Sequence, residues 1–185
     1  MKSKSLAVFA LVSLFLVGCI PSLHPLYTEN ELMFEPSLLG IWAEEDGGTS
    51  YEFIKNDSSS YTMIYTEDSI PSDFTAHLLK LGDNLFLNLQ PDEPECGNEF
   101  HKGYLIAAHS FYKVSLEKDV LRLDGLDVEW LRGLYQDRKT ELSREILQGD
   151  DFVLTASTKE LQEFVLKYAE NESAFPKEGE LFRQE

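Results

Sequence analysis

Cysteine is scarce in this sequence, with only two among 185 residues. The chain therefore lacks the disulfide framework of small secreted domains, and its stability must come from a hydrophobic core. Basic residues are also few, because 16 lysines and arginines stand against 33 acidic residues, for a net charge of −17. This charge argues against nucleic acid as a partner, since phosphates are bound by basic surfaces.

No apolar run approaches the roughly 20 residues that a transmembrane helix needs. The run from Leu6 to Val17 is broken only by Ser13, and Lys2 and Lys4 precede it. A short positive segment followed by a short apolar run is typical of a secretory signal peptide. We therefore expect residues 1–18 to be a signal peptide that is removed from the mature protein.

The end of this apolar run is the sequence Leu16-Val17-Gly18-Cys19. It resembles the lipobox of bacterial lipoproteins, which is an aliphatic residue, a small or branched one, Gly or Ala, and then Cys. The resemblance implies cleavage between Gly18 and Cys19, a diacylglycerol on the Cys19 sulfur, and an acyl chain such as palmitate on its new amino group. Two or three chains form a stable membrane anchor, whereas one does not. An ordinary signal peptide that happens to contain a cysteine is the alternative.

The residue after the cysteine is Ile20, not aspartate. In lipoproteins of enteric-type bacteria an aspartate there favours the inner membrane, so the resemblance implies the outer membrane of the cell envelope. If Cys19 carries lipid, Cys96 has no intramolecular disulfide partner.

Residues 19–38 form the segment between the lipid and the domain. It contains more apolar residues, between Leu26 and Phe34, than a flexible Ser/Gly-rich linker does. We expect this tether to pack partly on the domain. Contact with a partner or with the membrane interface is the alternative for these residues.

From residue 39 onward, apolar residues alternate with polar ones and turn residues separate the runs, which predicts antiparallel strands. The predicted strands are residues 39–45, 50–55, 60–66, 73–81, 84–89, 104–108, 110–116, 119–125 and 151–157. Two helices are expected, near 127–136 and at 157–169, the second with a Ser157-x-x-Glu160 capping box. The fold class is thus mostly β with two helices (α+β), within one domain over 39–170. Residues 171–185 are expected to be a loosely ordered tail.

About eight meandering strands and a late amphipathic helix predict a lipocalin-like barrel or a strongly curved sheet. Gly40-Ile41-Trp42 resembles the G-x-W that opens many lipocalins. The resemblance implies that Trp42 closes one barrel end and packs under an arginine of a late strand, for which Arg122 is the candidate. The Thr-Asp-Tyr triplet of that family is absent. A flatter sheet with helices on one face is the alternative.

The resemblance to bacterial lipoproteins extends further. An uncharacterised family of bacterial lipoproteins is similar to residues 16–45 and to the stretch "VLTASTKELQEFVLKYA". Because the activity of that family is not known, the similarity does not indicate a function.

If the barrel closes, large side chains of the first strands point into it. The candidates to line a ligand cavity there are Trp42, Tyr51, Phe53, Tyr61, Met63 and Tyr65. Small barrels either fill with side chains or hold one ligand, and both outcomes are open.

The loop 90–103 gathers the densest set of potential metal ligands, namely Asp92, Glu93, Glu95, Cys96, Glu99 and His101. Their spacing fits neither a structural zinc site nor an EF-hand, so we expect a solvated acidic loop and no metal. The strand histidines His77 and His109 are interpreted as structural. No hydrolase, metalloprotease, P-loop or dinucleotide motif occurs. We therefore predict no catalytic residue, no cofactor and no enzymatic activity.

The sequence thus predicts a cell-envelope lipoprotein anchored through Cys19. One hypothesis is that its lipocalin-like domain binds a small apolar ligand. The alternative is a non-catalytic structural or interaction module that contacts other envelope proteins.

Overall fold

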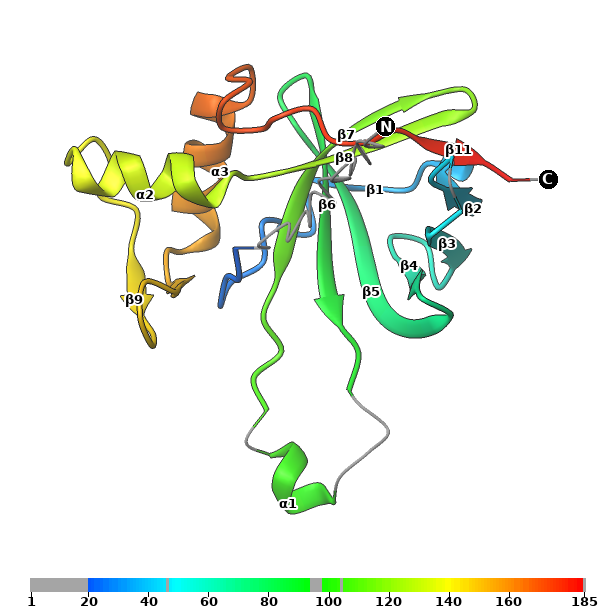
Figure 1. Ribbon diagram of the computed structural model, residues 1–185, viewed down its shortest axis with the longest axis horizontal. Helices are drawn as coiled ribbons and strands as arrows, with labels where there is room; N and C mark the ends of the chain where they lie inside the picture. The colour runs from blue at the N-terminus through cyan, green and yellow to red at the C-terminus, as the bar shows by residue number, and fades with distance from the viewer. Residues whose placement is uncertain (1–19, 46, 94–97, 104, 185) are drawn as a thin grey trace, which may run out of the picture.

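The computed structural model describes residues 20–45, 47–93, 98–103 and 105–184, and its centre is a closed antiparallel β-barrel (Figure 1). Seven barrel strands follow one another along the chain, joined without any crossover connection. They are β2 (Gly40–Ala43), β3 (Thr49–Lys55), β4 (Tyr61–Glu67), β5 (Ile70–Leu81), β6 (Asn84–Pro91), β7 (Ser110–Glu117) and β8 (Val120–Gly125). The predicted meander is confirmed.

Strand β11 (Leu181–Arg183) is the eighth barrel strand, and it pairs with β8 on one side and with β2 on the other. The ring closes because the long strand β5 pairs with β4 through its first half and with β6 through its second. A ninth strand, β1 (Leu32–Met33), adds to β5 beside Leu78 and Leu79. The fold is therefore a barrel and not the flatter sheet.

The expectation of a loosely ordered tail over 171–185 is wrong for the residues described, which extend to Gln184. Phe175 and Leu181 are buried, and β11 supplies two ladders of the barrel. The domain consequently extends well past residue 170. The charged residues between these apolar positions are largely exposed and made the whole segment look solvent-exposed, although Ala174, Phe175 and Leu181 among them are buried.

Side-chain alternation along the strands creates two separate cores. Ala76 and Leu78 of β5 and Leu87 of β6 face the barrel interior, while Leu79 and Phe86 face outward. The outward residues are covered by a second layer that contains the helices. Both faces of β5 and β6 are thus buried, which is why this part of the sequence is nearly continuous in apolar residues.

Two helices form the outer layer beside the barrel (Figure 1). They are α2 (Val128–Gln136), capped by Asp127, and α3 (Thr158–Tyr168), whose Ser157–Glu160 capping box is formed as predicted. Trp130 of α2 packs against Phe164 and Tyr168 of α3, with ring centroids 6.2 and 4.8 Å apart.

Between these helices the chain forms a small two-stranded sheet of β9 (Arg144–Ile146) and β10 (Phe152–Leu154). The predicted strand 151–157 is therefore shorter, and it belongs to this hairpin and not to the barrel.

The predicted strand at 104–108 is wrong. The ladder between β6 and β7 ends at the pair Leu89–Ser110, and beyond it the two strands separate into a long excursion. Among the described residues of this excursion, 105–108 have no strand neighbour. The excursion carries the short helix α1 (Glu99–Lys102) and projects away from the barrel (Figure 1).

The N-terminal segment packs on the domain, as expected. Leu26 and Leu38 are fully buried, and the 3-10 helix η1 (Pro36–Leu38) leads directly into β2. Within the described part of the chain, none of the helices has the length and apolar character needed to span a bilayer.

Candidate functional site

The structure brings all six predicted ligand-lining residues to the barrel interior. Trp42, Phe53, Tyr61 and Met63 are at most 2% exposed and belong to one buried cluster. Tyr51 and Tyr65 are half-buried and pack against that cluster, with their rings 5.1 Å apart. The phenyl ring of Phe53 meets the Tyr61 ring edge to face at 6.2 Å. The side chains thus fill the space around one another in this part of the barrel.

One barrel end is covered by residues 34–39, just before β2. Phe34 stacks on Tyr61 at 4.9 Å, and the Tyr61 hydroxyl accepts a hydrogen bond of 2.7 Å from the Glu35 amide. Burial raises the pKa of Tyr61. The Trp42 indole donates a hydrogen bond of 2.8 Å to the Leu38 carbonyl. These polar contacts fix the covering segment over the aromatic cluster.

The arginine over Trp42 is Arg183 of β11, so the assignment of Arg122 to this position is wrong. The guanidinium carbon of Arg183 lies 4.2 Å from the Trp42 ring centroid, within the range of a cation–π interaction. Arg122 faces the outside of the barrel and pairs with Glu180 at 3.5 Å. Because side chains alternate, Arg122 points away from the interior where Leu121 and Leu123 are buried.

A second cluster lies outside the barrel, where the N-terminal segment crosses strands β5 to β7. Ser22 exchanges two backbone hydrogen bonds of 2.8 Å with His109, and Leu23 donates one of 2.9 Å to Leu154. Ser22 itself is fully buried. Ile20, which immediately follows the predicted lipid-bearing cysteine, is also buried, at 6% exposed.

Asn88 organises the polar groups beneath this segment. It is fully buried, and its Oδ1 accepts a hydrogen bond of 3.0 Å from the Leu26 amide. Its Nδ2 lies 3.1 Å from Nδ1 of His109. On the other side, α3 holds the segment through Thr158 and Gln162, which donate to the carbonyls of Pro25 and Leu26 at 2.8 and 2.9 Å. Both faces of the segment are thus fixed by side chains.

Histidines 77 and 109 lie on this outer surface and do not face the barrel interior. The His77 ring stacks on Tyr27 at 4.4 Å, and its buried Nδ1 has no hydrogen-bond partner among the described residues. Burial lowers the pKa of both His77 and His109, and neighbouring His77 and His24 lower that of His109 further. Burial thus favours the neutral form of both rings, which agrees with the structural interpretation of the two residues.

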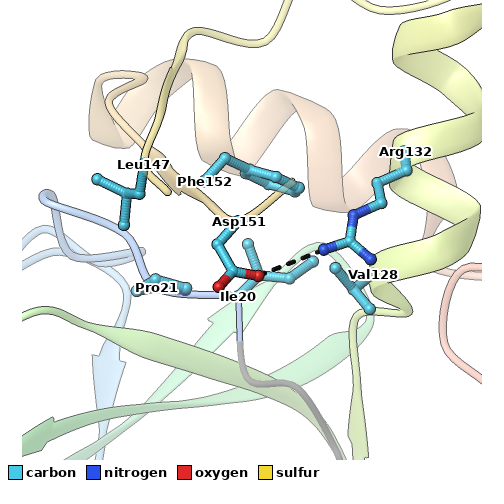
Figure 2. A pocket seen from close by; sticks show the side chains of 7 residues that line it. All are labelled: Ile20, Pro21, Val128, Arg132, Leu147, Asp151 and Phe152. Atoms are coloured by element: carbon cyan, nitrogen blue, oxygen red, sulfur yellow. Dashed lines mark ion pairs between the residues drawn. The ribbon is translucent and has the colours of Figure 1, made fainter. Parts of the chain in front are cut away.

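An apolar pocket of about 340 Å³ opens where the N-terminal segment meets α2 and the β9–β10 hairpin (Figure 2). The N-terminal segment contributes Ile20 and Pro21 to the lining, and α2 contributes Val128 and Arg132. The hairpin contributes Leu147, Asp151 and Phe152. This volume is at the lower end of the ~300–1,000 Å³ of small-molecule sites. Arg132 pairs with Asp151 at 3.5 Å, so the two charged residues of the lining neutralise each other (Figure 2).

The structure describes only some of the candidate metal ligands in the acidic loop 90–103. Glu95 and Cys96 lie outside the described residues, as do the side chains of Glu99 and His101. Glu93 pairs with Lys102 at 3.5 Å. In the part of the chain that the structure covers, no three His, Cys, Asp or Glu side chains converge to hold a metal ion.

The pocket and the Asn88 cluster were both missed by sequence reasoning. Asn88 carried one usable signal, because an asparagine interrupts the apolar run Leu85 to Leu89 at an outward-facing position. The pocket carried none, since it is built from three segments that are far apart in the sequence.

Comparison with known proteins returns no match, whether to a protein-family model, to a curated protein or to a solved structure.

Proposed function

We propose that this protein is a lipid-anchored, non-catalytic component of the bacterial cell envelope whose barrel is held in one orientation beside the bilayer. The lipobox-like sequence ending at Cys19 supports the anchor, and Ile20 after it supports the outer membrane. The observation that carries the proposal is that Ile20, the residue after the predicted lipid-bearing cysteine, is buried and belongs to the hydrophobic core outside the barrel. A flexible spacer would add about 3.3–3.6 Å of reach per residue, whereas a lipid on Cys19 would be attached one residue from the buried Ile20.

Metabolic labelling with radioactive palmitate tests the anchor in the intact cell. The wild-type chain should incorporate label and fractionate with membranes, while Cys19→Ala should do neither. Cys96→Ala is the matched control and should keep both properties. Equal labelling of wild type and Cys19→Ala, or no label in either, would refute the anchor.

The second candidate function is binding of a small apolar molecule, and the pocket beside Ile20 favours it over the barrel interior. The interior residues named above are packed against one another, whereas the pocket is an open apolar hollow. A fluorescent fatty acid should bind to the protein displaceably, and Val128→Trp should weaken the binding by filling the pocket. Ile54→Trp, at an exposed position of β3, is the control. Loss of binding in Ile54→Trp alone, or no displaceable binding to wild type, would exclude this site.

Contact with another envelope protein is the alternative, and two exposed residues of the β6–β7 excursion support it. Phe100 is 76% exposed and Ile106 is 78% exposed. Crosslinking in intact cells from a photoreactive residue at position 106 should then capture one envelope protein. A pattern identical to that from position 54 would count against a specific partner.

A further inference from the structure

The β9–β10 hairpin lies directly beside the site where the anchor joins the fold. Leu154 donates a hydrogen bond of 2.8 Å to the Pro21 carbonyl, and Leu147 lines the same pocket as Ile20 and Pro21. Figure 2 shows Leu147 and Pro21 together at the end of the pocket opposite Arg132. The position of the hairpin relative to the N-terminal segment is therefore fixed.

The hairpin presents two adjacent large apolar side chains at this place. Ile146 is 64% exposed and Leu147 is 57% exposed. Ile146 is the register partner of Phe152, which lines the pocket, and Leu147 lines the same pocket, so both exposed side chains belong to the hairpin that borders it. Single exposed apolar residues are ordinary on protein surfaces, but this pair adjoins the residues that follow the predicted lipid.

We propose that Ile146 and Leu147 insert into the interfacial layer of the bilayer that holds the anchor. The inference rests on the proposed function. If the lipid leaves the chain at Cys19, the bilayer surface lies within about one residue length of Ile20, a few ångströms. Surface groups fixed beside Ile20 and Pro21 then meet that bilayer, and apolar ones gain by leaving water.

The charges around the pair select the lipid class. Glu145 and Asp150 are exposed on the same hairpin, and the Arg144 guanidinium is stacked 3.5 Å from the Tyr135 ring. Anionic headgroups would be repelled by these carboxylates, since lipid surface charge acts over about a Debye length. The partner is therefore a zwitterionic bilayer surface.

Site-directed spin labelling of the full-length, acylated protein in phosphatidylcholine vesicles tests this inference. The background is Cys96→Ser, and the label is placed at Leu147→Cys, at Ile146→Cys or, as the control, at Ile54→Cys on β3. Lipid-soluble oxygen should relax the labels at 146 and 147 several-fold more than a water-soluble nickel chelate does, and the label at 54 should show the reverse. Adding anionic lipid should not deepen either hairpin site.

Co-flotation of the protein with the vesicles is measured in the same samples and separates the two proposals. In one outcome the protein floats with the vesicles while the labels at 146 and 147 are as accessible to the nickel chelate as the label at 54. That result would overturn the hairpin contact and leave the anchor intact. Deeper insertion in anionic vesicles would overturn the lipid class. Failure to float would overturn the anchor and the hairpin contact with it.

Discussion

The guanidinium of Arg183 lies over the indole of Trp42, 4.2 Å from its ring centroid. The two residues are register partners across the ladder between β11 and β2, where the last strand closes the barrel onto the first. Arg183 also donates hydrogen bonds to the carbonyls of Leu39, at 2.8 Å, and Ser37. A single side chain therefore links the closing strand to the covering segment and to the core tryptophan.

Arg183→Ala is expected to lower the free energy of unfolding by about 1–3 kcal/mol, because it removes the cation–π contact and a charged hydrogen-bond donor. Denaturant unfolding followed by tryptophan fluorescence measures the loss. Arg122→Ala is the control and should cost less than about 1 kcal/mol, since it breaks a partly exposed ion pair. A larger effect at Arg122 would contradict the role assigned to Arg183.

Gly40, the first residue of β2, lies next to the Arg183 side chain. Its φ of +113° is one that residues with a side chain rarely adopt, and a Cβ there would lie 3.1 Å from the Arg183 Nη1. Gly40→Ala is expected to destabilise the protein by about 1 kcal/mol or more, measured as a drop in Tm. Gly47→Ala, which meets no atom within 4 Å but also has a positive φ of 72°, separates backbone strain from crowding. Equal losses at both sites would mean that crowding by Arg183 contributes nothing.

Asn88→Leu should leave the Leu26 amide without its acceptor in a buried place. An unsatisfied buried donor costs about 1–3 kcal/mol, so we expect a loss of this size in denaturant unfolding. Hydrogen exchange at the Leu26 amide should accelerate by more than the global stability change alone explains. Asn30→Leu, at an exposed position, is the control and should change neither quantity. Unchanged exchange at Leu26 would show that Asn88 does not hold the N-terminal segment.

Acidification should destabilise the protein through His77 and His109. Burial lowers the pKa of both residues in the folded state, so below the unfolded value of about 6.5 the unfolded chain binds more protons than the folded one. The stability that the two histidines allow while neutral is therefore fully present above that pH, and it is lost as the pH falls below it. The double substitution His77→Gln with His109→Gln should flatten the fall in Tm between pH 7.5 and 5.5 relative to wild type. A fall as steep as in wild type would exclude the two histidines as its source.

The buried carboxyl group of Asp124 should make stability depend on pH in the opposite direction to the two histidines. Burial raises its pKa, and its Oδ1 accepts a hydrogen bond of 3.1 Å from the Glu178 amide. The pKa of Glu178 is raised first by burial and then by the Asp124 charge. For carboxyls raised in this way, stability is lost as pH rises through their folded-state values. Asp124→Asn keeps the acceptor and removes the charge, so it should raise Tm at pH 7 and leave it unchanged near pH 3. Asp83→Asn, at an exposed turn, is the control, and a lower Tm for Asp124→Asn at pH 7 would contradict this reasoning.

The parts of the fold that sequence reasoning predicted correctly depend on local signals. The capping box at Ser157 and Glu160 is formed because both partners lie within one turn, and the alternation in β3 and β4 follows from neighbours along the strand. Such features need no knowledge of distant residues. The helices and the seven-strand meander were therefore within reach of pattern analysis.

The errors concern contacts between distant residues. Strand β11 is three residues long, and its partners in β2 lie about 140 positions away, so no local pattern marked it. The choice between Arg122 and Arg183 depended on that missing strand. The side of the barrel on which His77 lies could not be read from the sequence either, and in the structure Ala76 and Leu78 occupy the interior face while His77 shares the outer face with Leu79. A strand that is buried on both faces lacks the alternation of apolar and polar residues that marks the inward side. Only the second layer, which covers the outer face of β5 and β6, shows which side chains point into the barrel.

The late position of β11 in the chain sets the order in which the barrel can form. A polypeptide that has reached residue 180 already contains β2 to β8, yet it exposes two unpaired strand edges, one on β2 and one on β8. Such edges are where chains pair wrongly with one another, and contacts of long sequence separation form slowly. The closing step joins residues 144 positions apart, so we expect it to be slower than the formation of the local hairpins. Until it occurs, the open edges of β2 and β8 remain available for pairing with another chain.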